Sequence, residues 1–283
     1  MRGYLPDYDF SSAYNLREAF QKLEEGEKPF AGGTDIMVLM DAGVLPAGRY
    51  FDISKLKELH GIKVLKNQVS LGALVTYSEV RHHKTIQKHF PILVESSKEV
   101  GAIAIQNRGT VGGNIANSSP AADFPPALLV YEAKINLISS SGLRTLDYTQ
   151  FHLGYKKSEL RSDELIQSVL LNPRYLAYHH FWRKVGSRQA QAISKTMIAA
   201  IAKLNKKTVE DIKIAFGSVA PTAIRCRQVE SFLLGKKLTP EVILEAKKIL
   251  TMDIQPIDDI RSTGKYRLTA SQNVLEEFLC GIG

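Results

Sequence analysis

The sequence contains little cysteine and lacks long hydrophobic runs. Cys226 and Cys280 are its two cysteines in 283 residues. Two cysteines so far apart cannot build a cysteine-rich metal or iron–sulfur site, and in a reducing compartment they are expected to be free thiols. No apolar run approaches the length of a membrane span, and residues 1–7 lack an apolar export signal. We therefore expect a cytoplasmic protein with no membrane segment and no iron–sulfur cluster of its own.

Clustered positive charge is also missing, although the formal net charge is +8. The denser basic groups, Lys206-Lys207 and Lys236-Lys237, fall in apparent turns, and aromatic residues do not alternate with them. A nucleic-acid-binding protein needs a basic groove, and for single strands also aromatic stacking platforms. The pattern instead indicates a solvated basic surface, so we expect no nucleic-acid partner. An anionic cofactor or an acidic partner subunit would suit this charge.

What the sequence does contain is a stretch rich in glycine and small polar residues, from Gln106 to Pro126. Its members include Gly109, Thr110, Gly112, Gly113, Asn114, Asn117, Ser118 and Ser119. Glycines allow a backbone to approach a ligand closely and to present N–H donors. Asn, Ser and Thr add donors and acceptors at short reach. The stretch is typical of a cradle for a polar, phosphorylated ligand.

A second stretch of this kind, residues 29–36, lies upstream and contains Gly32 and Gly33. It follows a short apolar run, and the expected geometry is a strand, a glycine turn and a helical turn. Such a turn can direct free N–H groups at an anion, although each stretch alone could be an ordinary tight turn. Neither stretch fits the dinucleotide fingerprint or the phosphate loop that ends in Gly-Lys-Ser/Thr. Together they indicate a nucleotide bound in some other fold.

Apolar spacing and turn residues predict an α+β fold with two domains. Hydrophobic residues form 44% of the chain, which is enough for a buried core. Helices are predicted at 12–26, with Ser12 as the cap, and at 78–81, 91–100, 121–131, 229–234, 240–250 and 268–279. Strands are predicted at 30–31, 49–53, 165–171, 177–185, 193–204 and 209–219, with hairpins at 62–71 and 135–142. Asn172-Pro173 marks an expected boundary between domains 1–173 and 174–283.

The two glycine stretches, in this order and at this separation, resemble the FAD-binding medium subunit of the xanthine dehydrogenase and carbon monoxide dehydrogenase family, the molybdenum hydroxylases. The resemblance covers nearly the whole chain. It includes residues 154–157, 181–195, 217–222 and 259–263. It implies an FAD-binding domain of the vanillyl-alcohol-oxidase/PCMH-like type, with subdomains at about 1–54 and 55–173. A smaller α+β domain with a three-stranded antiparallel sheet and helices would follow.

The resemblance also implies the cofactor contacts. The pyrophosphate would be held by Ala31, Gly32, Gly33, Thr34, Asp35 and Ile36, and Phe30 would also bind the cofactor. Phosphate and ribose contacts would be completed by Thr110, Gly113, Asn114, Asn117 and Ser119. Asp123 would accept hydrogen bonds from ribityl or ribose hydroxyls, Ile166 would pack near the flavin, and Lys184 would place a positive charge near it.

Some of these positions have other interpretations. Asp123 could instead cap a helix, and Lys184 could be an ordinary surface lysine. Tyr155 matches an aromatic position at the open face of the flavin, or it could be a buried tyrosine with a bonded hydroxyl. Gln106 stands where relatives often carry arginine, which weakens any charge contact there.

The implied function is electron transfer within a complex. A large partner subunit would carry molybdopterin, and a small one would carry [2Fe–2S] clusters. Electrons would pass from those clusters through non-covalent FAD on this chain to NAD+ or another acceptor, with no catalytic acid or base required here. The pairs His82-His83 and His179-His180 do not converge on a helix or strand, so we expect no metal site. An independent FAD-dependent oxidase and a non-redox nucleotide- or RNA-binding protein are the alternatives.

Overall fold

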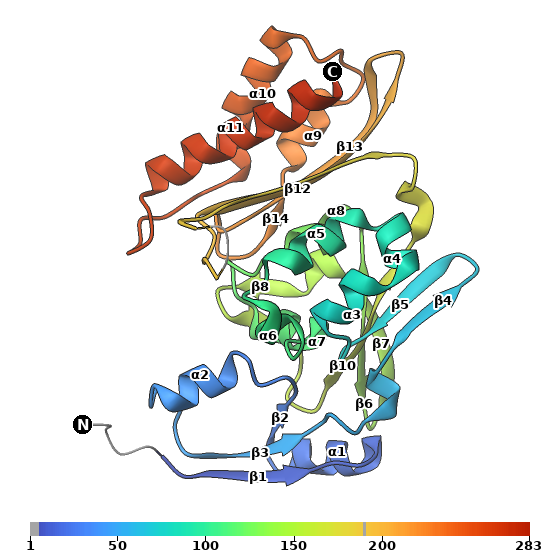
Figure 1. Cartoon of the computed structure of the whole chain (residues 1–283), viewed down its shortest axis with the longest axis vertical. Coiled ribbons are helices and arrows are strands. Elements are labelled where there is room, and N and C mark those ends of the chain that lie inside the picture. The colour runs from blue at the N-terminus through green and yellow to red at the C-terminus, as the bar shows by residue number, and fades with distance from the viewer. Residues whose placement is uncertain (1–5, 189–190) are drawn as a thin grey trace.

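The computed structural model describes residues 6–188 and 191–283. The expected absence of an export signal and the resemblance over 181–195 rest partly on residues 1–5 and 189–190, which lie outside the described residues. The chain forms three successive sheet-and-helix layers, from the first sheet in blue to the last helices in red (Figure 1). Among the described residues, no helix is long and apolar enough to cross a membrane.

The first sheet is parallel, with strand order β1-β3-β2. Its elements are β1 (Tyr8–Ser12), α1 (Leu16–Glu24), β2 (Lys28–Phe30), α2 (Ile36–Asp41) and β3 (Gly48–Asp52). The predicted succession of strand, glycine turn and helical turn is confirmed between β2 and α2. The prediction that Ser12 caps a helix is wrong, because Ser12 pairs with Asp52 as the last residue of β1. Asn15 caps α1 instead, since its side chain accepts a hydrogen bond from the Glu18 backbone.

The second sheet is antiparallel, with strand order β4-β5-β10-β6-β7. Its strands are β4 (Ile62–Leu65), β5 (Gln68–Gly72), β6 (Lys134–Ser139), β7 (Gly142–Asp147) and β10 (Leu165–Leu171). Both predicted hairpins are confirmed. Short elements accompany this sheet: η1 (Lys57–Leu59), η2 (Tyr148–Gln150), β8 (His152–Gly154), β9 (Lys157–Ser158) and η3 (Pro173–Tyr175).

Six helices lie between β5 and β6 in the chain. They are α3 (Tyr77–His82), α4 (Lys84–His89), α5 (Pro91–Glu99), α6 (Ile103–Gln106), α7 (Val111–Asn117) and α8 (Pro125–Val130). The helix predicted over 121–131 is shorter than expected. Pro125 and Pro126 lack the backbone N–H groups that would bond to the carbonyls of residues 121 and 122, so the helix begins at Pro125.

The third sheet is antiparallel, with order β11-β12-β13-β14. Its elements and helices are β11 (His179–Val185), β12 (Thr196–Asn205), β13 (Thr208–Gly217), β14 (Ile224–Arg225), α9 (Arg227–Leu233), α10 (Pro240–Asp253) and α11 (Gly264–Ile282). The three predicted strands are present, and the two-residue β14 adds a fourth. Alternate residues of β12 face different cores: Ala199 and Ile201 pack in the core that contains α5 and α8, whereas Ile198, Ala200 and Ala202 pack against α9–α11. Burial on both faces explains the continuous apolar run in this strand.

Candidate functional site

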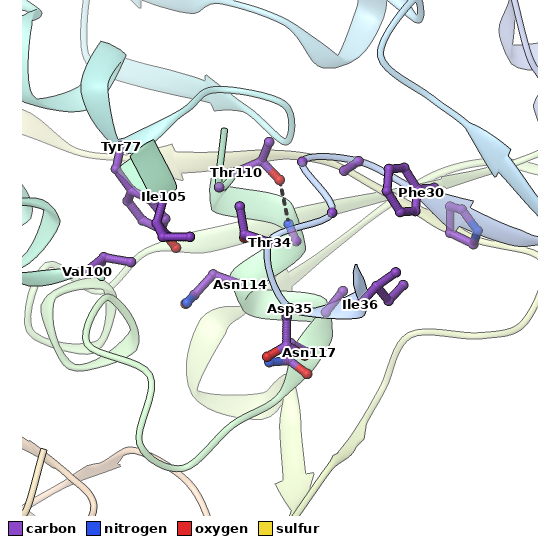
Figure 2. A pocket seen from close by; sticks show the side chains of 17 residues that line it. Phe30, Thr34, Asp35, Ile36, Tyr77, Val100, Ile105, Thr110, Asn114 and Asn117 are labelled. Carbon is purple, nitrogen blue, oxygen red and sulfur yellow. Dashed lines mark hydrogen bonds between the residues drawn. The ribbon is translucent and has the colours of Figure 1, made fainter. Parts of the chain in front are cut away.

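A pocket of about 390 Å³ lies between the loop that joins β2 to α2 and the helix α7 (Figure 2). The loop lines it with consecutive residues from Pro29 to Ile36. Helix α7 and the turn before it contribute Gly109, Thr110, Gly113, Asn114, Ala116 and Asn117, and three further residues, Tyr77, Val100 and Ile105, complete the lining. Both glycine stretches therefore face the same pocket.

The two stretches also touch each other directly. A Cβ added at Gly32 would lie 1.9 Å from the carbonyl oxygen of Arg108. The Arg108 Nε donates a hydrogen bond of 3.4 Å to the Gly32 carbonyl. Only a residue without a Cβ permits this approach, so Gly32 allows the two walls to meet at one edge of the pocket.

Part of the downstream glycine stretch, α7 at residues 111–117, is helical, which the sequence did not predict. The Thr110 side chain accepts a hydrogen bond of 3.1 Å from the Gly113 backbone and so caps α7. Thr110 also forms an isolated antiparallel bridge with Thr76, the residue that caps α3. The bridge holds the N-terminal ends of α3 and α7 side by side. Tyr77 of α3 and Asn114 of α7 therefore line the same pocket.

Three polar atoms near this pocket are buried without a hydrogen-bond partner among residues 6–188 and 191–283. They are the Tyr77 hydroxyl, Asn114 Oδ1 and Asp123 Oδ1. An unpaired buried polar group costs about 1–3 kcal/mol of stability. Tyr77 and Asn114 line the pocket, and the Asp123 carboxylate lies close enough to Tyr77 to help raise the pKa of its hydroxyl, after burial itself. A polar ligand that supplies hydrogen bonds fits this end of the pocket.

Asp123 forms a buried ion pair with a residue from the third sheet. Lys184 Nζ on β11 donates a hydrogen bond of 2.8 Å to Asp123 Oδ2 and one of 3.0 Å to the Glu99 carbonyl. The Lys184 side chain is 6% exposed, so it is not an ordinary surface lysine. Burial raises the pKa of the Asp123 carboxyl to about 7, although the Lys184 ammonium acts in the opposite direction. Asp123 does not cap α8, because no side chain caps that helix.

The family follows from two matches along the chain. Residues 6–173 match the family described as "FAD binding domain in molybdopterin dehydrogenase", and residues 182–281 match "CO dehydrogenase flavoprotein C-terminal domain". The first match alone covers more than half of the chain. The chain is an FAD-binding medium subunit of the molybdenum hydroxylase family. FAD belongs to this chain, and the molybdopterin and iron–sulfur cofactors belong to other subunits of such complexes.

Relatives and solved structures agree with this membership in the molybdenum hydroxylase family. The FAD subunit is 30% identical to the glyceraldehyde dehydrogenase medium chain of Sulfolobus acidocaldarius, over 93% of this chain and 94% of that one. It is 28% identical to the xanthine dehydrogenase FAD-binding subunit of Escherichia coli O157:H7, over 98% of each chain. A carbon monoxide dehydrogenase structure from Hydrogenophaga pseudoflava superposes with a TM-score of 0.93 at 25% identity, covering 97% of this chain and 96% of that one.

Most cofactor contacts expected from the sequence lie on this pocket. They are Phe30, Ala31, Gly32, Gly33, Thr34, Asp35, Ile36, Thr110, Gly113, Asn114 and Asn117. Ile166 lines a smaller cavity of about 80 Å³, which shares Pro29, Ala31, Thr110, Gly113 and Ala116 with the main pocket. Ser119, Asp123 and Lys184 line neither cavity, and the Ser119 hydroxyl accepts a hydrogen bond from the Ala121 backbone.

The structure also defines the surroundings of Tyr155 and Gln106. The Tyr155 side chain is 66% exposed, so its interpretation as a buried tyrosine is wrong. Gln106 is buried, and its amide accepts from Arg81 and donates to the carbonyls of Lys98 and Val100. Gln106 thus joins α3 to the C-terminal end of α5 through hydrogen bonds of a neutral side chain.

Sequence reasoning missed six pocket residues, which are Pro29, Tyr77, Val100, Ile105, Gly109 and Ala116. Pro29, Gly109 and Ala116 lie within the two glycine stretches but were not assigned a contact. The other three are apolar or aromatic residues in stretches that read as helices or connections, and nothing in their local pattern distinguishes them from core residues.

Proposed function

We propose that the pocket between the two glycine stretches is the FAD site of this subunit, and that FAD is held there without a covalent bond. The observation that carries this proposal is the convergence of residues 29–36 and 109–117 on one pocket with unpaired polar atoms at its edge. The glycine-bearing loop would approach the pyrophosphate, as its backbone can present N–H donors. Asn114, Asn117 and Thr110 would contact phosphate or ribose.

The buried pair of Asp123 and Lys184 would complete the site beside this pocket. Asp123 has one carboxylate oxygen bonded to Lys184 and one without a partner among the described residues. Its free oxygen suits a ribityl or ribose hydroxyl, while Lys184 supplies positive charge near the cofactor. Bound FAD supplies a group that exchanges electrons singly or in pairs. The residues of this chain bind it, orient it and set its electrostatic surroundings.

We further propose that electrons reach this subunit from [2Fe–2S] clusters of a small partner subunit and leave it for NAD+ or another acceptor. A large partner subunit would carry molybdopterin and the organic substrate. Names of relatives support this assignment, since they are medium chains or FAD subunits of dehydrogenases. In this arrangement residues 1–173 bind FAD, with subdomains at about 1–54 and 55–173, and residues 174–283 form the second domain. A cytoplasmic location stays a prediction.

The test of FAD binding begins with the purified full chain. FAD should bind at one molecule per chain, as measured by titration of FAD-free protein, and acid precipitation should release the yellow cofactor into the supernatant. A folded chain that takes up no FAD under any reconstitution condition would overturn the proposal. Yellow colour that stays in the precipitate would show a covalent bond instead.

The partner and acceptor assignments need the complex. The chain should be co-expressed with candidate iron–sulfur and molybdenum subunits and purified through a tag on this chain. Recovery of all three chains, with NAD+ reduced when substrate is added, is the expected result. Substrate-dependent reduction of an artificial dye without NAD+ reduction would point to another acceptor. A chain that purifies alone and oxidises a small substrate unaided would favour the independent oxidase.

A further inference from the structure

Tyr77 is held rigidly at one end of the FAD pocket. It is the first residue of α3, directly after the N-cap Thr76, which forms a capping box with Glu79. The bridge between Thr76 and Thr110 joins this helix start to the start of α7. A Cβ added at Gly109 would lie 3.1 Å from the Tyr77 ring, so the absence of a side chain there makes room for the ring. The position of the tyrosine is therefore set by the same contacts that set α7.

The Tyr77 hydroxyl is a buried polar group that the protein does not satisfy. The residue is 2% exposed, and its hydroxyl has no hydrogen-bond partner in the described parts of the chain. Its ring lines the pocket and extends beside Ile105 toward the side on which Val100 and Asn114 lie (Figure 2). Asn114 Oδ1, on the same pocket, is also buried without a partner in those residues. Two unsatisfied polar groups on one pocket wall indicate a ligand that bonds to them.

Other buried tyrosines of the chain behave differently. The Tyr131 hydroxyl accepts a hydrogen bond of 3.2 Å from the Ile92 backbone and lies 3.0 Å from His180 Nδ1. The Tyr148 hydroxyl lies 2.8 Å from His152 Nε2. These hydroxyls have structural partners, whereas the Tyr77 hydroxyl has none among the described residues. A hydroxyl that contributes nothing to the fold and is costly to bury is better explained by a ligand.

We propose that the Tyr77 hydroxyl is a hydrogen-bonding contact for bound FAD, an inference that rests on the FAD site proposed above. Carboxylate and amide oxygens accept hydrogen bonds, while a tyrosine hydroxyl can donate or accept. Together with Asn114 Oδ1 and Asp123 Oδ1, Tyr77 therefore forms an end of the site that is rich in acceptors. Hydroxyl or ring N–H groups of FAD have the matching chemistry.

The variant Tyr77→Phe tests this inference. The inference predicts that this variant binds FAD more weakly but is at least as stable as the wild type. The FAD dissociation constant should rise by about threefold to tenfold, the range expected for one lost hydrogen bond. The melting temperature of the FAD-free protein should stay equal or rise, because the variant removes an unsatisfied hydroxyl. The matched control is Tyr131→Phe, which should lower that melting temperature by leaving the Ile92 N–H without its acceptor, with FAD affinity unchanged.

The outcomes separate the inference from the FAD site itself. If the wild-type chain takes up no FAD, the FAD site fails, and the inference fails with it. If the wild type and Tyr77→Phe bind FAD equally, the inference is overturned while the FAD site stands. A crystal structure of the FAD-loaded wild type gives a check that needs no variant. The Tyr77 hydroxyl should lie within about 3.5 Å of an oxygen or nitrogen of FAD, and a longer distance overturns the inference.

Discussion

Gly32 and Gly33 lie in the loop after β2, whereas Gly112 and Gly113 lie inside helix α7. In the loop, a Cβ at Gly32 would meet the Arg108 backbone at 1.9 Å, and Gly33 has a φ of +72°, which favours glycine. In the helix, a Cβ at Gly112 would meet the Ala73 Cβ at 2.6 Å. A Cβ at Gly113 would meet only the Thr110 hydroxyl within 4 Å, at 2.8 Å.

This difference shows that glycines in similar sequence contexts have different structural roles. Gly32 and Gly112 bring parts of the protein together, whereas Gly113 leaves space on the pocket wall. The loop needs glycine for its backbone to turn and to approach its neighbour. The helix needs glycine at position 112 for packing, and at position 113 glycine keeps the pocket open. Substitutions should therefore separate stability from FAD binding in the helix, but not in the loop.

The largest effect is expected for Gly32→Ala. The new Cβ would overlap a backbone carbonyl that no side-chain rotation can move, so the two stretches must separate. Overpacking of this kind costs about 3 kcal/mol at the upper end of its usual range. We expect chemical denaturation to show that loss in the FAD-free protein, and FAD titration to show that most binding is lost.

Gly48→Ala, at the start of β3, is the matched control, because its Cβ would have an ordinary contact of 3.6 Å with the Tyr50 ring. It should change neither measurement appreciably. If Gly32→Ala unfolds at the same denaturant concentration as the wild type, the contact between Gly32 and Arg108 is not a constraint on the fold.

A smaller effect concerns pH, because the downstream glycine stretch, residues 106–126, contains the buried carboxyl of Asp123, whereas Asp35 of the upstream stretch is exposed. The folded pKa of Asp123 is about 7, against an ordinary value of 3.8. Between these values the folded chain keeps a proton that the unfolded chain has lost, so stability must fall as pH rises. From about pH 5 to about pH 6, this one group lowers the free energy of unfolding by about 1.4 kcal/mol.

The measurement is the difference between the wild type and Asp123→Asn, since other carboxyls titrate in both proteins. The wild type should lose stability relative to the variant as pH rises through that interval. Parallel pH curves for the two proteins would show that the carboxyl is ionised in the fold throughout the range. In that case Lys184 compensates fully for the burial of Asp123.

The sequence predicted the elements that local pattern controls and the residues that local composition marks. Both hairpins, three of the four strands of the third sheet and the two glycine stretches were found this way, because alternation, turn residues and glycine content act over a few positions. Ser12 was misassigned because its pairing with β3 is a distant contact. Tyr77 was missed because its role arises only when α3 and α7 are held together by the bridge at Thr76 and Thr110.

The pairing of Asp123 with Lys184 illustrates the same limit. The resemblance placed both residues near the cofactor, but nothing in the sequence indicated that they bond to each other. Lys184 lies on β11, and packing of the third sheet against α5 brings it to the Glu99 carbonyl and to Asp123. Which residues meet across layers depends on how the sheets pack, and no local pattern records that.

The smallest effect on stability is expected for Gly113→Ala. This variant gives the sharpest test of the difference between the glycines of the loop and those of the helix. Alanine is a better helix former than glycine by about 0.5–1 kcal/mol. Against this gain, the new Cβ would crowd the Thr110 hydroxyl that caps α7, and loss of such a cap costs about 1 kcal/mol. The two effects oppose each other, so the free energy of unfolding should change by less than about 1 kcal/mol.

FAD affinity should nevertheless fall in Gly113→Ala, because Gly113 lines both the main pocket and the smaller cavity beside it. Urea denaturation of the FAD-free protein and FAD titration measure the two quantities separately. Gly112→Ala in the same helix should clearly lower the free energy of unfolding, unlike Gly113→Ala, because its Cβ would press on Ala73. If Gly113→Ala binds FAD as tightly as the wild type, Gly113 serves only the helix, and the cofactor does not approach this turn of α7.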